Sequence, residues 1–199
     1  MSLLAGILAM FIPAHCYAPE TADERRAVYA IVRDTCDEQG VAEHVCTAAI
    51  AKAWRESRGN PCARHTLGRG EDGVGLYGQS PKFWLWTVRA LRRGRDPFRD
   101  PRLGTLALFR EYQYAVRRGA RSLRDLQRVH SGHSPRDDRW PERDNRWCWL
   151  LAHGPRDDRH VVAWEPTDCM AEVTLEDLGP RLDDERMRAL DTPTPTTEN

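Results

Sequence analysis

Apolar side chains recur at helical intervals along most of this chain of 199 residues, and the runs begin and end at residues typical of helix termini. The first run follows Thr21 and Glu24, which have the spacing of a capping box, and it should end by Gly40. The second run covers about residues 41–57, and Gly59 follows it as a helix-ending glycine. These runs predict two consecutive helices in the first third of the chain.

A glycine-rich stretch, residues 67–80, interrupts the helical pattern directly after the second run, and so many glycines favour turns or a short hairpin. Helical spacing then resumes in segments opened by a proline or a capping side chain. These segments are 81–93, 101–119, 122–130 and 142–153. The pattern predicts a mainly α (α+β) fold with one small β-hairpin or Gly-rich loop after the second helix.

The composition divides the chain into three parts. Residues 1–18 are almost wholly apolar and end in small residues, which indicates an export signal or another hydrophobic N-terminal segment. Residues 19–174 are ordinary globular material, enough for one domain. Charge, Pro and Thr dominate residues 175–199, which predicts a polar, disordered tail. No run is long enough to span a membrane as a mature helix.

Charge and cysteine usage narrow the possible partners. The formal net charge is +0, whereas a nucleic-acid binder usually carries a basic excess, so we expect no nucleic-acid partner. The six cysteines contain no C-x-x-C pair, which favours disulfides over a zinc site, and we prefer a Cys148–Cys169 bridge because both residues flank one short segment. His130 and His133 have no second pair at ligand spacing, so we expect no metal, and no motif requires a cofactor.

Glu56 is the residue most suited to chemistry. It falls in the last turn of the second predicted helix, on the face of Ala49 and Ala53 and next to Trp54. Glycoside cleavage needs a carboxylic acid with a raised pKa in a partly apolar cleft, and this position fits that need. By itself, a Glu at a helix end is usually a solvated surface residue. Rings on which sugars can stack follow it at Tyr77, Phe83, Trp84 and Trp86.

Two motifs extend the case for Glu56. They are Glu56-Ser57-x-x-Asn60-Pro61-x-Ala63 and Gly73-x-Gly75-Leu76-Tyr77-x-Gln79. Together they resemble the E-S-x-x-N-P-x-A and G-x-x-G-L-M-Q pattern of the soluble lytic transglycosylases, over about residues 41–132. In this chain Tyr77 stands where Met is usual, and Gly78 is an extra residue before Gln79. A later A-Y-N-x-G motif of that family has a weak counterpart ending in His130-Ser131-Gly132.

The resemblance implies a lysozyme-like domain that cleaves the glycan strand of peptidoglycan between N-acetylmuramic acid (MurNAc) and N-acetylglucosamine (GlcNAc). Glu56 would act first as general acid and then as general base, while a hydroxyl of the substrate closes on the anomeric carbon and leaves an anhydro-muramyl end. The resemblance also implies residues that bind the substrate or orient Glu56. These are Ser57, Gly75, Leu76, Tyr77, Gln79, His130 and Ser131.

Other interpretations stay open at this stage. Asp72 is most simply a turn residue before Gly73, but as a second carboxylate it would position water and make the protein a lysozyme-type hydrolase. A non-catalytic wall-binding protein on the same fold is a further alternative. We expect an exported protein, periplasmic or extracellular, or a phage protein associated with the virion or with lysis. The oligomeric state is left open.

Overall fold

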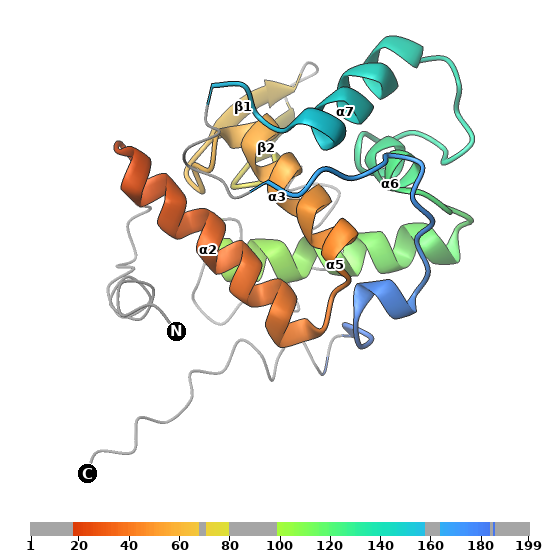
Figure 1. Cartoon of the computed structure of the whole chain (residues 1–199), viewed down its shortest axis with the longest axis horizontal. Helices are drawn as coiled ribbons and strands as arrows, with labels where there is room; N and C mark the ends of the chain where they lie inside the picture. The colour runs from red at the N-terminus through yellow and green to blue at the C-terminus, as the bar shows by residue number, and fades with distance from the viewer. Residues whose placement is uncertain (1–17, 68–70, 80–98, 158–163, 184, 186–199) are drawn as a thin grey trace.

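The computed structural model describes residues 18–67, 71–79, 99–157, 164–183 and 185, without the side chains of 65–67 and 71–72. Most of the predicted export signal, the predicted helix 81–93 and the rings of Phe83, Trp84 and Trp86 lie outside the described residues. Helices predominate in the described part, which confirms the mainly α class (Figure 1). None of the helices described combines the length and the apolar character that a membrane span needs.

Helix α2 (Ala22–Gln39) begins and ends as its sequence predicts. The backbone N–H of Glu24 donates to the Thr21 hydroxyl (3.2 Å), and the Glu24 carboxylate accepts from the N–H of Thr21 (2.8 Å), so the capping box is complete. At the other end Gly40 adopts a left-handed conformation, with φ of 60°.

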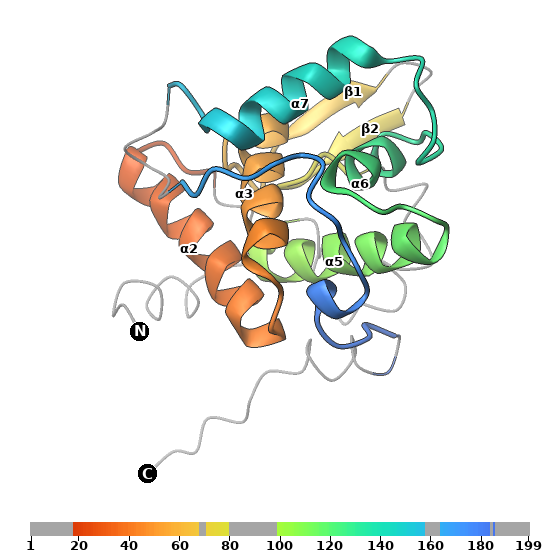
Figure 2. The ribbon, with the colours of Figure 1, turned by 45° about the vertical axis from the view of Figure 1, so that its right-hand side comes forward.

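Helix α3 (Glu43–Ser57) is the central element of the fold and packs against α2 and α7 (Figure 2). Its alanines, among them Ala49 and Ala53, are fully buried, and their small side chains let neighbouring helices approach closely. Arg58 caps the end of the helix with a left-handed φ of 56°, one residue before the predicted Gly59. Gly59 continues the turn with φ of 75°.

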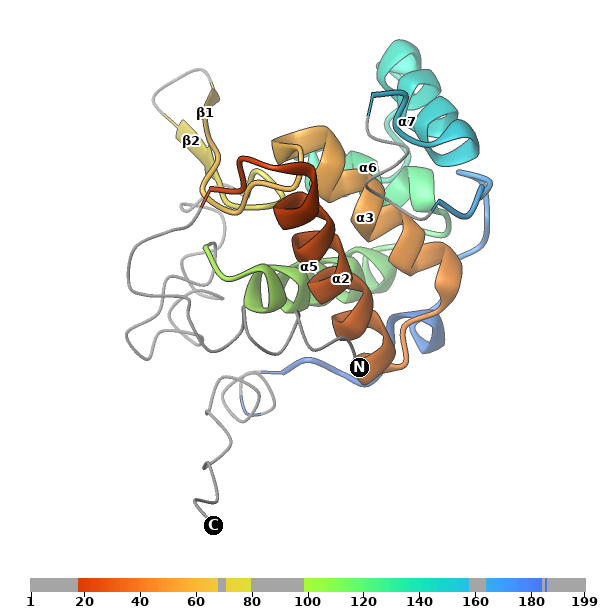
Figure 3. The same cartoon turned by 60° about the vertical axis from the view of Figure 1, so that its left-hand side comes forward.

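The glycine-rich stretch forms a hairpin, as expected, although it begins earlier than predicted. Strands β1 (Arg64–Leu67) and β2 (Glu71–Val74) pair antiparallel, with Arg64 opposite Val74. The hairpin lies to one side of the helices, close to the end of α3 (Figure 3). A turn over residues 75–78 follows it and is closed by backbone pairing of Val74 with Gln79.

Three further α-helices belong to the described residues. They are α5 (Pro101–Arg117), α6 (Leu123–His130) and α7 (Pro141–His153), each within two residues of its predicted bounds. Side chains cap two of them, because Asp100 accepts from the N–H of Arg102 (2.9 Å) and Ser122 accepts from that of Asp125 (3.2 Å). The core lies between α2, α3, α5 and α7. Its fully buried members include Val32, Ala49, Leu106, Phe109 and Trp147.

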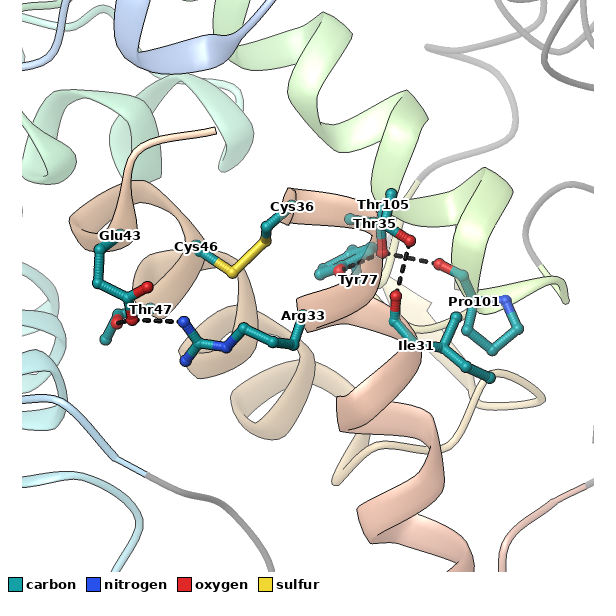
Figure 4. The surroundings of a disulfide bond; sticks show 10 residues. All are labelled: Ile31, Arg33, Thr35, Cys36, Glu43, Cys46, Thr47, Tyr77, Pro101 and Thr105. Atoms are coloured by element: carbon teal, nitrogen blue, oxygen red, sulfur yellow. Dashed lines mark hydrogen bonds and ion pairs between the residues drawn. A yellow bond between two sulfur atoms is a disulfide. The ribbon is translucent and has the colours of Figure 1, made fainter. Parts of the chain in front are cut away.

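Two disulfides join elements of the described part. Cys148–Cys169 ties α7 to the C-terminal segment and confirms the predicted pair. Cys36–Cys46 joins the end of α2 to α3 (Figure 4). An ion pair between Arg33 and Glu43 links the same two helices.

The segment that opens the predicted polar tail packs against the helices instead of being disordered. It contains a short 3-10 helix, η1 (Glu176–Leu178), and buries the side chains of Leu178 and Leu182. The amide of Gln113 on α5 donates to the carbonyl of Pro180 (2.9 Å) and accepts from the N–H of Leu182 (3.0 Å). The boundary at 175 is therefore wrong, because two apolar side chains and a buried amide hold this segment in place.

Replacing Cys148 and Cys169 together by Ala should lower the free energy of unfolding by about 3 kcal/mol, because the bridge closes a loop with a separation of 21 residues. Urea unfolding under non-reducing conditions measures the loss. The matched control replaces Cys36 and Cys46, whose separation is 10, and should lose about 0.6 kcal/mol less. Unchanged stability of the first variant would contradict the expectation.

Candidate functional site

Glu56 lies in the last turn of α3, with its side chain 28% exposed. The turn that follows the hairpin covers part of it. A Cβ atom at Gly78 would come within 3.3 Å of Glu56 Oε2, so the glycine backbone rests against the carboxylate. Gly78, the residue that is extra relative to the family motif, thus has a place beside Glu56.

Lys52 is the group that the sequence analysis missed. It precedes Glu56 by one helical turn, and its side chain is only 1% exposed. Its ammonium donates to Glu56 Oε1 (3.0 Å) and to Oε1 of Gln127 on α6 (2.8 Å). The i, i+4 spacing of the two residues was the available signal, since such pairs share one face of a helix. The spacing does not show that the Lys52 side chain is buried, and this is evident only from the structure.

The charge of Lys52 changes the chemistry expected of Glu56. Burial alone would raise the pKa of Glu56, but the positive charges of Lys52, His130 and Arg55 outweigh it and lower the pKa to about 2. The raised pKa expected from the sequence is therefore wrong for this arrangement. Burial also lowers the pKa of Lys52, against the attraction of Glu56.

His130 is held at both ring nitrogens. Nδ1 lies 2.9 Å from Oε2 of the buried Glu111, and Nε2 lies 3.1 Å from the carbonyl oxygen of Tyr77. The carboxylate and the carbonyl are both hydrogen-bond acceptors, so each ring nitrogen faces a polar partner. His130 therefore supports the turn over residues 75–78 and has no ring nitrogen left for a ligand.

The motif residues next to Glu56 hold the turn and the core in place. The Ser57 hydroxyl lies 2.9 Å from the carbonyl oxygens of both Ala53 and Leu76, so it joins the end of α3 to the turn. The side chains of Leu76 and Tyr77 belong to the core. The Tyr77 ring is fully buried and its hydroxyl pairs with Thr105 (2.8 Å), so its predicted use as a sugar platform is wrong. Burial raises the pKa of the Tyr77 hydroxyl.

The other predicted site residues are spread around this centre. Gly75 is buried, and its N–H donates to the carbonyl of Ala63 (3.0 Å). Gln79 is buried too, and its Nε2 atom has no hydrogen-bond partner among the described residues. Ser131 accepts from the amide of Gln127 (3.1 Å), which places it two contacts from Lys52. Asp72 stands opposite Thr66 in the hairpin, and its side chain lies outside the described part.

No protein-family model, curated protein or solved structure matches this chain. The interpretation of the site therefore depends on its motif residues and on their geometry.

Replacing Lys52 by Met should raise the pKa of Glu56 from about 2 toward its ordinary value of 4.5, because burial then opposes a weaker positive field. A ¹³C NMR titration of the Glu56 carboxyl carbon measures this pKa. The control is Arg117→Met, which removes an exposed charge at the end of α5 and should leave the titration unchanged. A pKa that stays near 2 in the Lys52 variant would show that other cations control Glu56.

Replacing Glu56 by Gln should lower the free energy of unfolding at pH 7 by about 2 kcal/mol, because Lys52 loses its counter-charge while Glu56 itself is partly exposed. The folded-state pKa of about 2 lies below the ordinary 4.5, so ionised Glu56 stabilises the fold above pH 4.5 and loses this effect as the pH falls to 2.

Urea unfolding of wild type and variant across pH 2–7 should therefore show a stability difference that shrinks as the pH falls. Glu176→Gln, at an exposed position, serves as the control and should show no such convergence. A difference that is constant with pH would argue against the Lys52–Glu56 pair as its source.

Proposed function

We propose that this protein is a peptidoglycan lytic transglycosylase that cleaves the glycan strand between MurNAc and GlcNAc, with Glu56 as general acid/base. The observation that carries the proposal is the meeting of the two motifs at one carboxylate. Glu56 ends a buried helix, remains partly exposed, and lies against the backbone of Gly78 in the turn that carries the second motif. A glycine backbone beside the acid leaves room for a sugar to approach it.

The resting charge state of Glu56 suits a base, so an acid step needs a source for the proton. Lys52 can supply it, because its Nζ lies 3.0 Å from Oε1 and burial already lowers its pKa. A glycan that covers the exposed part of Glu56 would remove water and thereby favour the neutral form of the pair. The proton would then move from the Lys52 ammonium to the Glu56 carboxylate.

The remaining steps return the site to its starting state. Protonated Glu56 gives its proton to the glycosidic oxygen as the bond from that oxygen to the anomeric carbon breaks. A hydroxyl of the same muramyl unit then bonds to the anomeric carbon, and ionised Glu56 accepts the proton that this hydroxyl loses. The proton finally returns to the Lys52 amine, which restores the ion pair. The turn held by Ser57 and His130 would keep Glu56 in place throughout.

The alternative function is wall binding without cleavage. The Lys52–Glu56 ion pair favours it, because a carboxylate with a pKa of about 2 is ionised at rest and cannot donate a proton in that state. The two disulfides support an exported location for either function, since disulfides persist in oxidising compartments.

Product analysis on purified peptidoglycan tests the proposal. Wild-type protein should release muropeptides with anhydro-muramyl ends, identified by mass spectrometry. Glu56→Gln should lower the rate at least about 100-fold, because the acid/base is lost. The control Glu176→Gln removes an exposed carboxylate from η1 and should retain full activity.

Each other outcome has a definite meaning. Undiminished release by Glu56→Gln overturns the assignment of Glu56. Reducing ends in the products would indicate hydrolysis, with Asp72 as the next carboxylate to replace. Binding of insoluble wall by the wild type without any release would favour the non-catalytic alternative.

A further inference from the structure

A small cleft opens next to Glu56, between α3, the end of α6 and α7. Three arginines line it, Arg55 from α3, Arg128 from α6 and Arg143 from α7. Trp140 and His133 also line it, with ring centroids 5.6 Å apart. The cleft is small and partly open to solvent, so a small polar group suits it better than a whole sugar chain does.

The charges around the cleft do not balance. Arg128 is neutralised by Asp144, since its Nε donates to Oδ2 (3.0 Å) and both side chains are almost buried. Arg143 lies over the Trp140 ring, 4.9 Å from its centroid, and pairs with no carboxylate in the described part of the chain. Arg55 lies 3.9 Å from Glu56 Oε1, but this oxygen is already bound by Lys52. The cleft therefore keeps a positive excess.

The electrostatics of Arg55 reflect this excess. Burial lowers the pKa of Arg55, the attraction of Glu56 opposes that effect, and repulsion from Arg143 and Arg146 adds to it. An anion in the cleft would relieve the repulsion between Arg55 and Arg143.

Hydrogen bonding indicates the same class of ligand. The Nη1 atom of Arg55 and the Nε2 atom of His133 are both buried and have no hydrogen-bond partner among the described residues. A buried donor without an acceptor destabilises the fold, because it has lost its hydrogen bonds to water. An Arg side chain can only donate, so the group that satisfies it must be an acceptor. A carboxylate offers two acceptor oxygens and a negative charge, and Arg guanidinium groups bind it well.

We propose that this cleft binds a carboxylate carried by the wall polymer, with Arg55 and Arg143 as the groups that recognise it. The inference rests on the proposed function, because Arg55 adjoins Glu56 in the sequence and Gln127 belongs both to the cleft and to the Lys52 contacts. MurNAc carries a lactyl carboxylate that GlcNAc lacks. Where a stem peptide is attached to that group, the carboxylates belong to the peptide instead.

Carboxylate recognition at this place would have two consequences. The protein would discriminate peptidoglycan from neutral polymers of GlcNAc. It would also set the register of the strand, because the acidic unit would have to lie at the cleft while a neighbouring glycosidic bond lies at Glu56.

Binding of small probes that cannot be cleaved tests the inference. The probes are GlcNAc, MurNAc and a MurNAc-dipeptide whose free carboxylate lies on the peptide, each titrated against the wild-type protein by NMR. At least one acidic probe should bind about 10-fold more tightly than GlcNAc, and added salt should weaken that preference. A preference for MurNAc identifies the lactyl group as the ligand, and a preference for the dipeptide identifies the stem.

Arg143→Gln should lower the affinity for the acidic probe about 10-fold and leave that for GlcNAc unchanged. Arg143 is exposed on α7, so this variant should fold. Arg55→Gln should show the same selective loss. Arg117→Gln is the matched control, because it removes an exposed charge of the same kind from α5 and should bind as the wild type does.

Equal binding of GlcNAc and both acidic probes would overturn the inference, as would unchanged acid binding by Arg143→Gln. These results are separable from the proposed function, since binding of monosaccharides needs no cleavage. If the wild type shows no preference for acidic probes but releases anhydro products normally, carboxylate binding in the cleft is rejected and the transglycosylase assignment stands. If the protein prefers acidic probes but cleaves no glycan, carboxylate binding in the cleft stands and the wall-binding alternative is supported.

Discussion

The arrangement around Glu56 depends on one buried positive charge. Lys52 lies in the middle of α3 with its ammonium out of water, where an uncompensated charge would cost several kcal/mol. Glu56 supplies the opposite charge from the same helix, and Gln127 supplies a neutral acceptor from α6. For the Lys52 face of α3 to be buried, α6 must therefore lie where the Gln127 amide can accept from the Lys52 ammonium. The Glu56 carboxylate is placed by α3 itself, one turn after Lys52.

A second buried polar contact, between His130 and Glu111, connects the helices to the turn after the hairpin. His130, also on α6, joins Glu111 of α5 to the carbonyl of Tyr77. Ser57 holds the same turn through the carbonyl of Leu76. The backbone beside Glu56 is thus fixed from two helices, and its dipoles are oriented before any ligand arrives. Fixed polar surroundings of this kind lower the cost of rearrangement when charge moves in a site.

Local signals made much of the fold predictable. The capping box at Thr21 and the caps at Asp100 and Ser122 satisfy backbone groups within a few residues, so the sequence alone indicates where α2, α5 and α6 begin. Which side chains are buried depends on segments distant in the sequence, and this was harder to predict. The role of Lys52 and the burial of Tyr77 follow from contacts with α6 and α5, which no spacing along the chain reveals. The place of Glu56 in the last turn of α3 was predictable, whereas its charged surroundings were not.

The contact between Gly78 and Glu56 restricts the chain in two unrelated ways. The backbone there has a φ of 59°, which L-residues with a side chain rarely adopt, and an added methyl group would crowd Oε2 of the carboxylate. The backbone conformation and the contact with the carboxylate therefore favour glycine independently. A larger residue here would strain the backbone even if the carboxylate moved aside. In homologous sequences, a glycine at the position of Gly78 would therefore indicate that the carboxylate of Glu56 lies in the same place.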